Sequence, residues 1–244
     1  MIVIANGMLR SGSTLQYNLA ARVLETAGPL TRAGFLGDFS NPDTRTRLEE
    51  MKASDGWTII KTHEAPLPRD FYDGRVRVLF SYRDVRDIAA SIRKKWGFPF
   101  EQIISDIASM IEIERAVAEL PNVLVQSYDK LYYDPLSATH EITQFLNIPL
   151  DEAAVVRISV ETSIDSQSNA IARSSTLVRG LVNRLKRQAY DAKTLLHPDH
   201  ISATGGKDGD WKNQFTEAQI NMLSDRFGDW LIAHSYQNSK VHDS

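Results

Sequence analysis

The chain has 244 residues, of which 42% are hydrophobic and 24% are charged, and it carries a net charge of −3. This composition excludes a disordered, a collagen-like and a disulfide-scaffolded protein. The absence of cysteine also excludes iron–sulfur clusters, cysteine-ligated zinc and thiol nucleophiles. No segment is apolar enough for a membrane span, and the first residues lack the basic and apolar regions of a secretory signal. We therefore expect a cytoplasmic globular protein without a transmembrane anchor.

Short β-branched runs alternate with longer helical patterns, which is the order typical of a parallel sheet covered by helices. Strands are expected, in chain order, at Ile2–Ala5, Trp57–Lys61, Arg77–Tyr82 and Asn122–Ser127. Helices are expected at about Ser13–Ala27 and Asp84–Trp96 and within Phe100–Leu120, where isoleucines recur at helical spacing. The segment Gly28–Asp55 is interpreted as a loop with one short helix. The sequence thus predicts an α/β, P-loop-containing fold of three layers with a central, mainly parallel sheet. We expect one domain over residues 1–244, with a mobile insertion at about 165–204.

A loop that contains glycine, hydroxyl and basic residues, Gly7–Thr14, connects the first expected strand to the first helix. Backbone N–H groups converge where a strand, such a loop and a helix N-terminus meet, and the helix dipole adds partial positive charge. The spacing fits the nucleotide-triphosphatase pattern GxxxxGK[ST], except that Ser13 replaces the lysine that clamps the phosphates. Arg10 supplies a cation instead. The loop therefore predicts a phosphate site that is poorly suited to ATP or GTP hydrolysis.

The sequence RSGST in this loop resembles the 5′-phosphosulfate-binding loop of the sulfotransferase family, usually written PKSGTT. Ser11, Gly12 and Thr14 match that motif, whereas Arg10 stands in place of a lysine and Ser13 in place of a threonine. Arginine keeps the positive charge but presents a planar fork instead of a point charge. The resemblance implies a cofactor, 3′-phosphoadenosine-5′-phosphosulfate (PAPS), whose 5′ end these five residues bind.

The second expected strand ends in Lys61, Thr62, His63 and Glu64. The carboxyl ends of parallel strands face the ligand crevice, and residues two apart on an extended segment point to the same side. Lysine can stabilise the charge that develops in a sulfuryl transfer, and histidine can take the proton of an acceptor hydroxyl. The segment resembles the family's KTH motif, which implies that Lys61 contacts the transferring group and that His63 is the catalytic base. Glu64 is the alternative base.

The third expected strand leads into YRDVRDIAAS, in which Arg83 and Ser91 are eight residues apart. An arginine fork and a hydroxyl from two elements can bracket one phosphate. The spacing resembles the family's 3′-phosphate motif, which implies this role for both residues. A salt-bridged helix start accounts for Asp84, Arg86 and Asp87, but it does not account for the pair Arg83 and Ser91.

A glycine-rich segment near the C-terminus, Gly205–Asn213, resembles the family's motif RKGxxGDWKN. The usual Arg-Lys pair is absent, and Lys207 replaces part of its charge. Trp211 is expected to anchor this segment on the core. The resemblance implies further cofactor contacts from Gly205, Gly206, Lys207 and Gly209. Two weaker matches, Tyr128 and Thr162, indicate adenine contacts, with a strand-end aromatic and a helix N-cap as equal alternatives.

These motifs together predict a PAPS-dependent sulfotransferase, a cytoplasmic nucleotide-binding transferase, that acts by in-line displacement and releases 3′-phosphoadenosine-5′-phosphate (PAP). Arg10 and Lys61 would stabilise charge while His63 activates the acceptor, a hydroxyl of a small molecule or amphiphile. No metal is expected, because cations and a helix N-terminus neutralise the charge. The alternatives are a P-loop small-molecule kinase and a non-catalytic PAPS-binding protein. No nucleic-acid partner is expected.

The acceptor pocket is expected to be lined by residues 34–55, 96–100 and 165–204. Within the last range, residues 174–193 show a basic amphipathic pattern. Such a helix can pack on the protein surface, cover the active site as a lid, or lie on a membrane surface. A dimerisation motif of the family, KxxxTVxxxE, has no match after Phe215, so the oligomeric state stays open.

Overall fold

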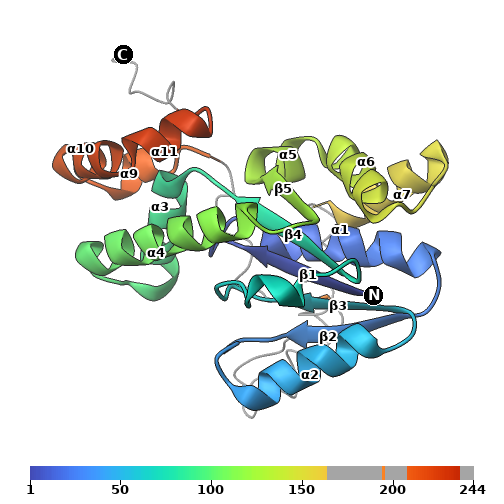
Figure 1. Ribbon diagram of the computed structural model, residues 1–244. Helices are drawn as coiled ribbons and strands as arrows, with labels where there is room; N and C mark the ends of the chain where they lie inside the picture. The colour runs from blue at the N-terminus through green and yellow to red at the C-terminus, as the bar shows by residue number, and fades with distance from the viewer. Residues whose placement is uncertain (164–193, 196–207, 237–244) are drawn as a thin grey trace, which may run out of the picture.

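A parallel β-sheet runs through the centre of the computed structural model, which describes residues 1–163, 194–195 and 208–236 (Figure 1). In this described part of the chain the sheet has five strands: β1 (Ile2–Gly7), β2 (Leu30–Phe35), β3 (Trp57–Lys61), β4 (Val76–Tyr82) and β5 (Val123–Ser127). Their order is β2-β3-β1-β4-β5. β1 is central and pairs in parallel with β3 on one side and β4 on the other. The carboxyl end of β1 therefore lies where the strand order changes direction, which is where parallel α/β sheets bind ligands.

Helices cover both faces of the sheet and make a three-layer fold (Figure 1). One face carries α1 (Ser13–Thr26), α5 (Tyr128–Tyr133), α6 (Pro135–Leu146) and α7 (Glu152–Thr162). The other face carries α2 (Pro42–Ala53), the short helix η1 (Arg69–Phe71), α3 (Val85–Trp96) and α4 (Phe100–Ala118). Beyond the end of the sheet, α9 (Trp211–Gln214) and α10 (Glu217–Arg226) pack on α3, and α11 (Gly228–Ala233) packs on α10 (Figure 1). The predicted α/β class and layer order are confirmed.

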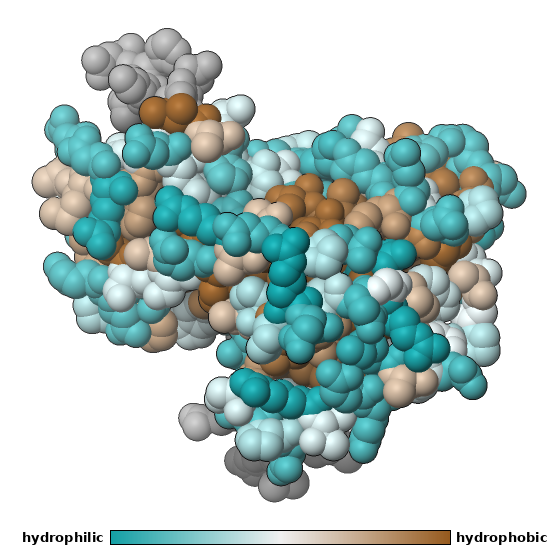
Figure 2. Space-filling model, viewed as in Figure 1, coloured by the Kyte–Doolittle hydropathy of each residue, from teal (hydrophilic) through white to brown (hydrophobic). Residues whose placement is uncertain are grey.

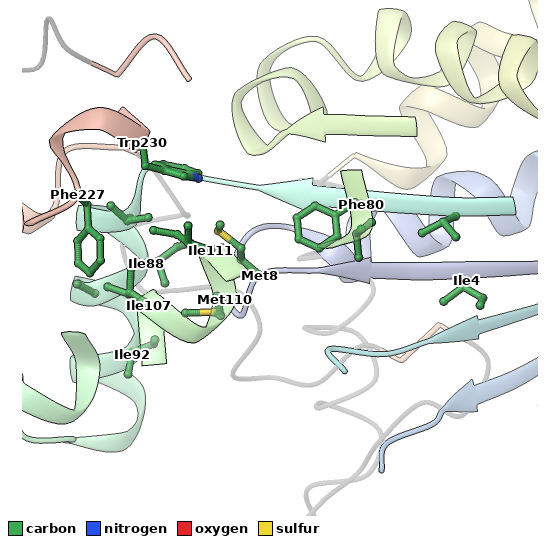
Figure 3. Close-up of a cluster of buried hydrophobic side chains, with 14 of the residues drawn as sticks. Ile4, Met8, Phe80, Ile88, Ile92, Ile107, Met110, Ile111, Phe227 and Trp230 are labelled. Atoms are coloured by element: carbon green, nitrogen blue, oxygen red, sulfur yellow. The ribbon is translucent and has the colours of Figure 1, made fainter. Parts of the chain in front are cut away.

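Alternation along the strands divides the hydrophobic core in two. Val3 and Ala5 of β1 face α1, whereas Ile2 and Ile4 belong to the cluster that includes α3, α4 and α11. Figure 3 shows this second cluster, in which Met8 lies among isoleucines of α3 and α4. Because successive strand residues point to opposite faces, a sheet that is buried on both faces needs apolar side chains at every position.

The helix ends follow local chemistry. Asp84 caps α3 by accepting a hydrogen bond from the backbone N–H of Arg86, and α3 ends at Gly97 with a left-handed φ of 66°. α10 begins with a capping box in which Thr216 and Gln219 bond each other's backbone N–H groups. These caps satisfy N–H and C=O groups that have no partner within the helix.

One part of the chain differs from the sequence expectation. The segment Gly28–Asp55 contains a full edge strand, β2, as well as the twelve-residue helix α2, whereas only a loop and a short helix were expected. β2 pairs with β3 through a register shift between Arg32 and Gly34. Its sequence, LTRAGF, lacks a strong strand pattern because the strand is only partly buried at the edge of the sheet.

The surface seen in Figure 2 is largely hydrophilic, with hydrophobic residues confined to separate patches. Within the described residues, no helix combines the length and the apolar character that crossing a bilayer requires.

Candidate active site

The loop after β1 has a tightly determined shape. Gly7 lies opposite Ser81 of β4, and a Cβ at Gly7 would come within 2.3 Å of the Ser81 Oγ. Ser11 is fully buried, and its hydroxyl bonds the Met8 carbonyl at 2.7 Å and the Ser81 carbonyl at 2.9 Å. Gly12 has a φ of 83°, and a Cβ there would lie 2.9 Å from the Tyr128 ring. Ser11 therefore points into the protein and holds the loop, rather than pointing out of it.

The loop places the N-terminus of α1 at the carboxyl ends of the strands. Gly12 is the N-cap residue and provides no side-chain cap, so the first N–H groups of α1 have no acceptor within the helix. Ser13 is buried and Thr14 is half-buried in this first turn. An exposed set of helix N–H groups with the positive end of the helix dipole is a general anion site.

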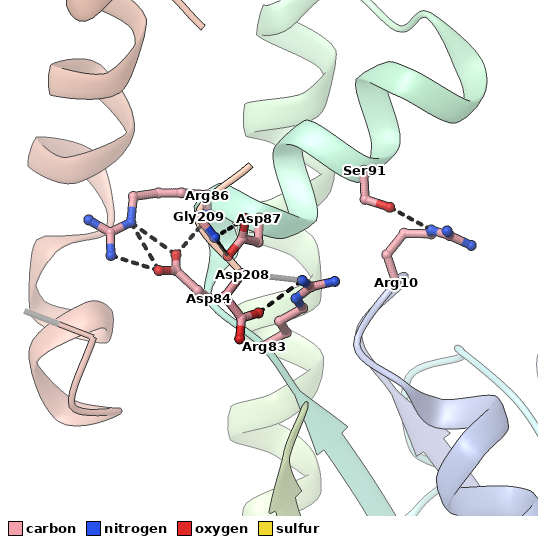
Figure 4. A network of polar contacts seen from close by, with 8 residues as sticks. All are labelled: Arg10, Arg83, Asp84, Arg86, Asp87, Ser91, Asp208 and Gly209. Carbon is pink, nitrogen blue, oxygen red and sulfur yellow. Dashed lines mark hydrogen bonds and ion pairs between the residues drawn. The ribbon is translucent and has the colours of Figure 1, made fainter. Parts of the chain in front are cut away.

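Arg10 lies at the tip of the same loop and connects it to α3. Its backbone has a φ of 64°, a left-handed conformation that is uncommon for a residue other than glycine. Its Nε donates a hydrogen bond of 2.8 Å to the Ser91 Oγ (Figure 4). Arg10 and Ser91, assigned from the sequence to opposite ends of the cofactor, are thus direct neighbours.

Lys61 and His63 lie beside the loop, at the carboxyl end of β3. The Nζ of Lys61 is 2.9 Å from Nε2 of His63, and Nδ1 of His63 is 2.7 Å from the Gly7 carbonyl oxygen. Because a carbonyl only accepts hydrogen bonds, Nδ1 carries the proton, and the lone pair of Nε2 faces Lys61. The contact with Gly7 therefore sets both the tautomer and the direction of the imidazole.

The electrostatic surroundings of Lys61 are unusual for a lysine. It is only 7% exposed. Burial, which is the largest cause, and the positive charges of Lys95 and Arg10 together lower the pKa of Lys61 to about 7. The Phe35 ring, at the end of β2, lies 5.6 Å from the Lys61 Nζ and 5.9 Å from the His63 ring.

Glu64, the alternative base, is held by its backbone. Its N–H donates to the Thr62 hydroxyl at 3.1 Å, and its carbonyl accepts from the Asn6 side chain at 3.0 Å. Its half-buried carboxylate lies toward Gly37, where an added Cβ would meet Oε1 at 3.4 Å.

Arg83 lies at the next strand end, directly after β4, and is almost completely buried. Its guanidinium carbon lies 3.9 Å from the centre of the Tyr128 ring, the first residue of α5. Its Nη2 donates to the Asp208 carboxylate at 2.9 Å (Figure 4). One face of the guanidinium is therefore covered by an aromatic ring, and one edge is bound by a carboxylate.

Further carboxylates surround Arg83. Asp84 binds Arg86 through both oxygens, as a salt-bridged helix start predicts. Asp87 instead accepts the Gly209 N–H at 3.0 Å with each oxygen. Burial raises the pKa of Asp87 to about 6, although Arg83 opposes this shift. The pKa of Asp129 is also raised to about 6, by burial first and by the negative charge of Asp208 second.

The remaining residues that the sequence assigns to the site lie partly within and partly outside the described residues. Tyr128 directly follows β5, begins α5 and lies against the Arg83 guanidinium, and its contact with adenine stays a prediction. Thr162 is the last residue of α7, and its hydroxyl donates to the Ile158 carbonyl at 2.7 Å. A helix that Thr162 or Ser163 could cap would begin outside the described residues, so the N-cap interpretation stays a prediction. Gly209 has a φ of 85°, and Trp211 is buried under Arg86 as expected of an anchor. Gly205, Gly206, Lys207 and the insertion at about 165–204, apart from Thr194 and Leu195, lie outside the described residues.

The structure places at the site three residues to which the sequence analysis assigns no role. Ser81 clamps the loop, Phe35 lies against His63, and Asp208 binds Arg83. Asp208 lies in the glycine-rich segment Gly205–Asn213. Its negative charge, among residues expected to bind the cofactor, is the signal that could have identified it. Over residues 1–163, 194–195 and 208–236, no cluster of three or more histidines and carboxylates could hold a metal ion.

Comparison with known proteins shows that the chain is similar to members of one protein family. A model of the sulfotransferase domain matches residues 98–235. Sulfotransferase 1C2 of Oryctolagus cuniculus is 23% identical over 211 residues, which cover 78% of this chain and 67% of that protein. Sulfotransferase 1A1 of Bos taurus is 25% identical over 213 residues, which cover 79% and 68%.

Solved structures show the same fold. Mouse sulfotransferase SULT7A1 complexed with PAP has a TM-score of 0.65 and 18% identity, with 98% of this chain and 84% of that chain covered. Retinol dehydratase in a complex with retinol and PAP has a TM-score of 0.63 and 16% identity, with 100% and 83% covered.

Proposed function

The chain belongs to the sulfotransferase family, and we propose from this premise that the residues at the carboxyl ends of β1, β3 and β4 carry out its reaction. The enzyme transfers a sulfuryl group from PAPS to an acceptor. Membership of the family does not by itself assign a role to each residue of this chain. The contact between His63 and the Gly7 carbonyl carries the assignment, because it joins the base to the phosphate loop.

The residues at the site fit PAPS. The open N–H groups at the start of α1, with Arg10 beside them, suit the 5′-phosphosulfate. The buried Arg83 with Ser91 on the neighbouring helix suits the 3′-phosphate, and Tyr128 presents an aromatic ring between these two ends. When bound, PAPS supplies the sulfuryl group and a leaving phosphate.

His63 takes the proton of the acceptor hydroxyl. With Nδ1–H donated to Gly7, the base is Nε2, the nitrogen that faces Lys61. Lys61, when charged, lies next to the same point and neutralises negative charge that develops there. Arg10 and the α1 N-terminus neutralise charge on the other side. The chain therefore brings the base and the cations together at one point.

The substitutions His63→Ala and Glu64→Gln test the assignment of the base. We expect His63→Ala to reduce kcat by about 10²–10⁴-fold, because general-base catalysis is worth that much, while PAP binding in calorimetry without Mg²⁺ is retained. The control is His140→Ala, which changes an exposed histidine of α6 that pairs with Glu152. Unchanged turnover of His63→Ala together with loss of turnover in Glu64→Gln would move the role to Glu64.

The acceptor that we propose is a hydroxyl compound with an apolar or aromatic face. Phe35 is 49% exposed although it lies against His63, and the exposed Trp96 stacks on Phe98 at the end of α3. An exposed aromatic side chain beside a base provides a flat apolar surface for such a ligand. Phe35→Ala is expected to raise the KM for aromatic acceptors about tenfold and to leave PAP binding unchanged. We also propose that the enzyme is cytoplasmic and that residues 1–244 form one domain.

A further inference from the structure

Asp208 contacts the residue that reads the 3′-phosphate in the proposed function. Its Oδ1 accepts a hydrogen bond of 2.9 Å from the Nη2 of Arg83. The Arg83 side chain is 7% exposed and the Asp208 side chain 33% exposed, so the carboxylate approaches the buried guanidinium from the solvent side. The opposite approach is restricted, because the Tyr128 ring lies against the guanidinium at 3.9 Å.

The loop around Asp208 is attached on the side that follows it in the chain. The Gly209 N–H donates to both oxygens of Asp87, and the Asp210 carboxylate pairs with the Lys94 Nζ at 2.7 Å. These contacts hold residues 208–210 against α3 (Figure 4). They leave the Asp208 side chain directed at Arg83.

The charge around Arg83 is already balanced by protein carboxylates. Asp87, Asp129 and Asp208 all interact with this guanidinium electrostatically, while the neighbouring Arg86 is bound to Asp84. A phosphate that arrived in addition to Asp208 would bring like charges together in a desolvated site, which is strongly unfavourable.

We propose that Asp208 competes with the 3′-phosphate of the nucleotide for Arg83. The inference rests on the proposed function, because it takes Arg83 as the 3′-phosphate ligand. Binding of the phosphate then requires the Asp208 carboxylate to leave the guanidinium, and the exchange of one anion for another weakens the net affinity. Asp208 thus sets how strongly the enzyme prefers nucleotides that carry a 3′-phosphate.

The substitution Asp208→Asn tests the competition, with Asp225→Asn, at an exposed aspartate of α10, as the matched control. Calorimetry would compare the binding of PAP with that of adenosine 5′-phosphate, which lacks the 3′-phosphate. Removal of the competing charge is expected to tighten PAP binding about tenfold, since a charged hydrogen bond of this kind is worth about one power of ten. Binding of adenosine 5′-phosphate should not change, and Asp225→Asn should leave both affinities as in the wild type.

The variant Arg83→Gln separates this inference from its premise, with Arg83→Lys as a second variant in case the buried glutamine disturbs folding. Loss of the preference for PAP over adenosine 5′-phosphate in either variant supports Arg83 as the 3′-phosphate ligand. If that preference is lost and Asp208→Asn still binds PAP no more tightly than the wild type, the competition is overturned while the proposed function stands. A wild-type protein that does not bind PAP would instead overturn the proposed function.

Discussion

The two ends of the candidate cofactor site are built in different ways. At the Lys61 and His63 end, backbone groups determine the shape: the Gly7 carbonyl orients His63, and the Met8 and Ser81 carbonyls hold Ser11. At the Arg83 end, side chains do so, and the partner of Arg83 is 125 positions away in the sequence. The first end has a fixed geometry, whereas the second depends on a balance of charges that one substitution can shift.

Helix α3 connects the two ends. Ser91 on this helix accepts a hydrogen bond from Arg10 of the phosphate loop, and Lys95, one turn further along, acts on the charge of Lys61. Asp87 on the same helix holds the loop that carries Asp208. The ends are therefore mechanically joined although they are built differently.

Among the substitutions that compare the two ends, Lys61→Met is expected to have the largest effect, because it removes the cation at the backbone-built end. We expect kcat to fall about 10²–10³-fold, as for the loss of one group that stabilises charge in a transition state. The preference for PAP over adenosine 5′-phosphate should persist, because it belongs to the other end. Lys130→Met, which removes a surface lysine of α5 that pairs with Glu141, is the control, measured in the same transfer assay with labelled PAPS. A loss of less than about tenfold in Lys61→Met would show that Lys61 is not needed for the chemistry.

Gly7→Ala is expected to break the scaffold of that end. The added methyl group would lie 2.3 Å from the Ser81 Oγ and 2.9 Å from the Ser81 carbonyl oxygen, so the backbone of β1 or β4 must move. Overpacking of this kind lowers the free energy of unfolding by about 2–3 kcal/mol. Chemical denaturation measures it, with Gly74→Ala as the control, since nothing lies within 4 Å of a Cβ at Gly74. Equal free energies of unfolding of the two variants would contradict the close packing of Gly7 against Ser81.

A pH-dependent effect is expected where α11 supports the side-chain-built end. Nε2 of His234 is 2.7 Å from a Glu114 oxygen and Nδ1 is 2.9 Å from the Trp230 carbonyl, so both nitrogens donate and the ring is charged. Burial opposes this charge, but the hydrogen bonds to Glu114 and Trp230 outweigh it and raise the pKa of His234. The stability that the charged ring contributes is therefore complete below the unfolded pKa of about 6.5 and is lost as the pH rises through the higher folded value.

Glu114→Gln tests this pair. The variant should lose about 1–3 kcal/mol of unfolding free energy at pH 6 and less at pH 9, as thermal or urea unfolding at both pH values would show. Glu112→Gln on the same helix removes only an exposed pair with Arg115 and should have no measurable effect. A loss in Glu114→Gln that is the same at both pH values would mean that His234 is not charged.

The smallest effect is expected from Lys95→Gln, which tests the connection through α3. The charge of Lys61 is lost as the pH rises through about 7, so kcat/KM of the wild type should decline above that pH. Removal of the Lys95 charge raises the pKa of Lys61 and should move the decline to higher pH, by less than about one pH unit, because half-exposed charges are screened. If kcat/KM of Lys95→Gln declines at the same pH as that of the wild type, Lys95 does not act on the charge of Lys61.

The sequence predicted the parts of the site that lie close together in the chain. The strand Trp57–Lys61 is confirmed residue for residue, and the loop before Ser13 and the helix after Asp84 lie where their patterns place them. All three depend on local features, namely β-branched runs, glycines and a capping aspartate. The edge strand β2 was missed, because half of its environment is solvent and its residues carry no burial pattern.

Contacts between distant segments could not be predicted. Ser11 matched a motif residue, but its hydroxyl bonds Ser81, seventy positions away, and the pairing of Arg10 with Ser91 joins two motifs that had been assigned to separate phosphates. The partner of Arg83 could be found only once β4 and residues 208–210 were seen together. Motifs indicate which residues form a site, whereas long-range packing determines which of them face a ligand.

The position of β1 also governs how the protein reaches its native state. Ile2 pairs with Thr58 and with Val76, so no neighbour of the central strand is close to it in the sequence. Long loops must close before those pairings form, and such topologies fold slowly. During synthesis the phosphate loop leaves the ribosome before β4, so it takes its shape only after Ser81, which clamps it, has followed. The central strand is thus made before both of its neighbours, and until they follow its apolar side chains need protection from aggregation.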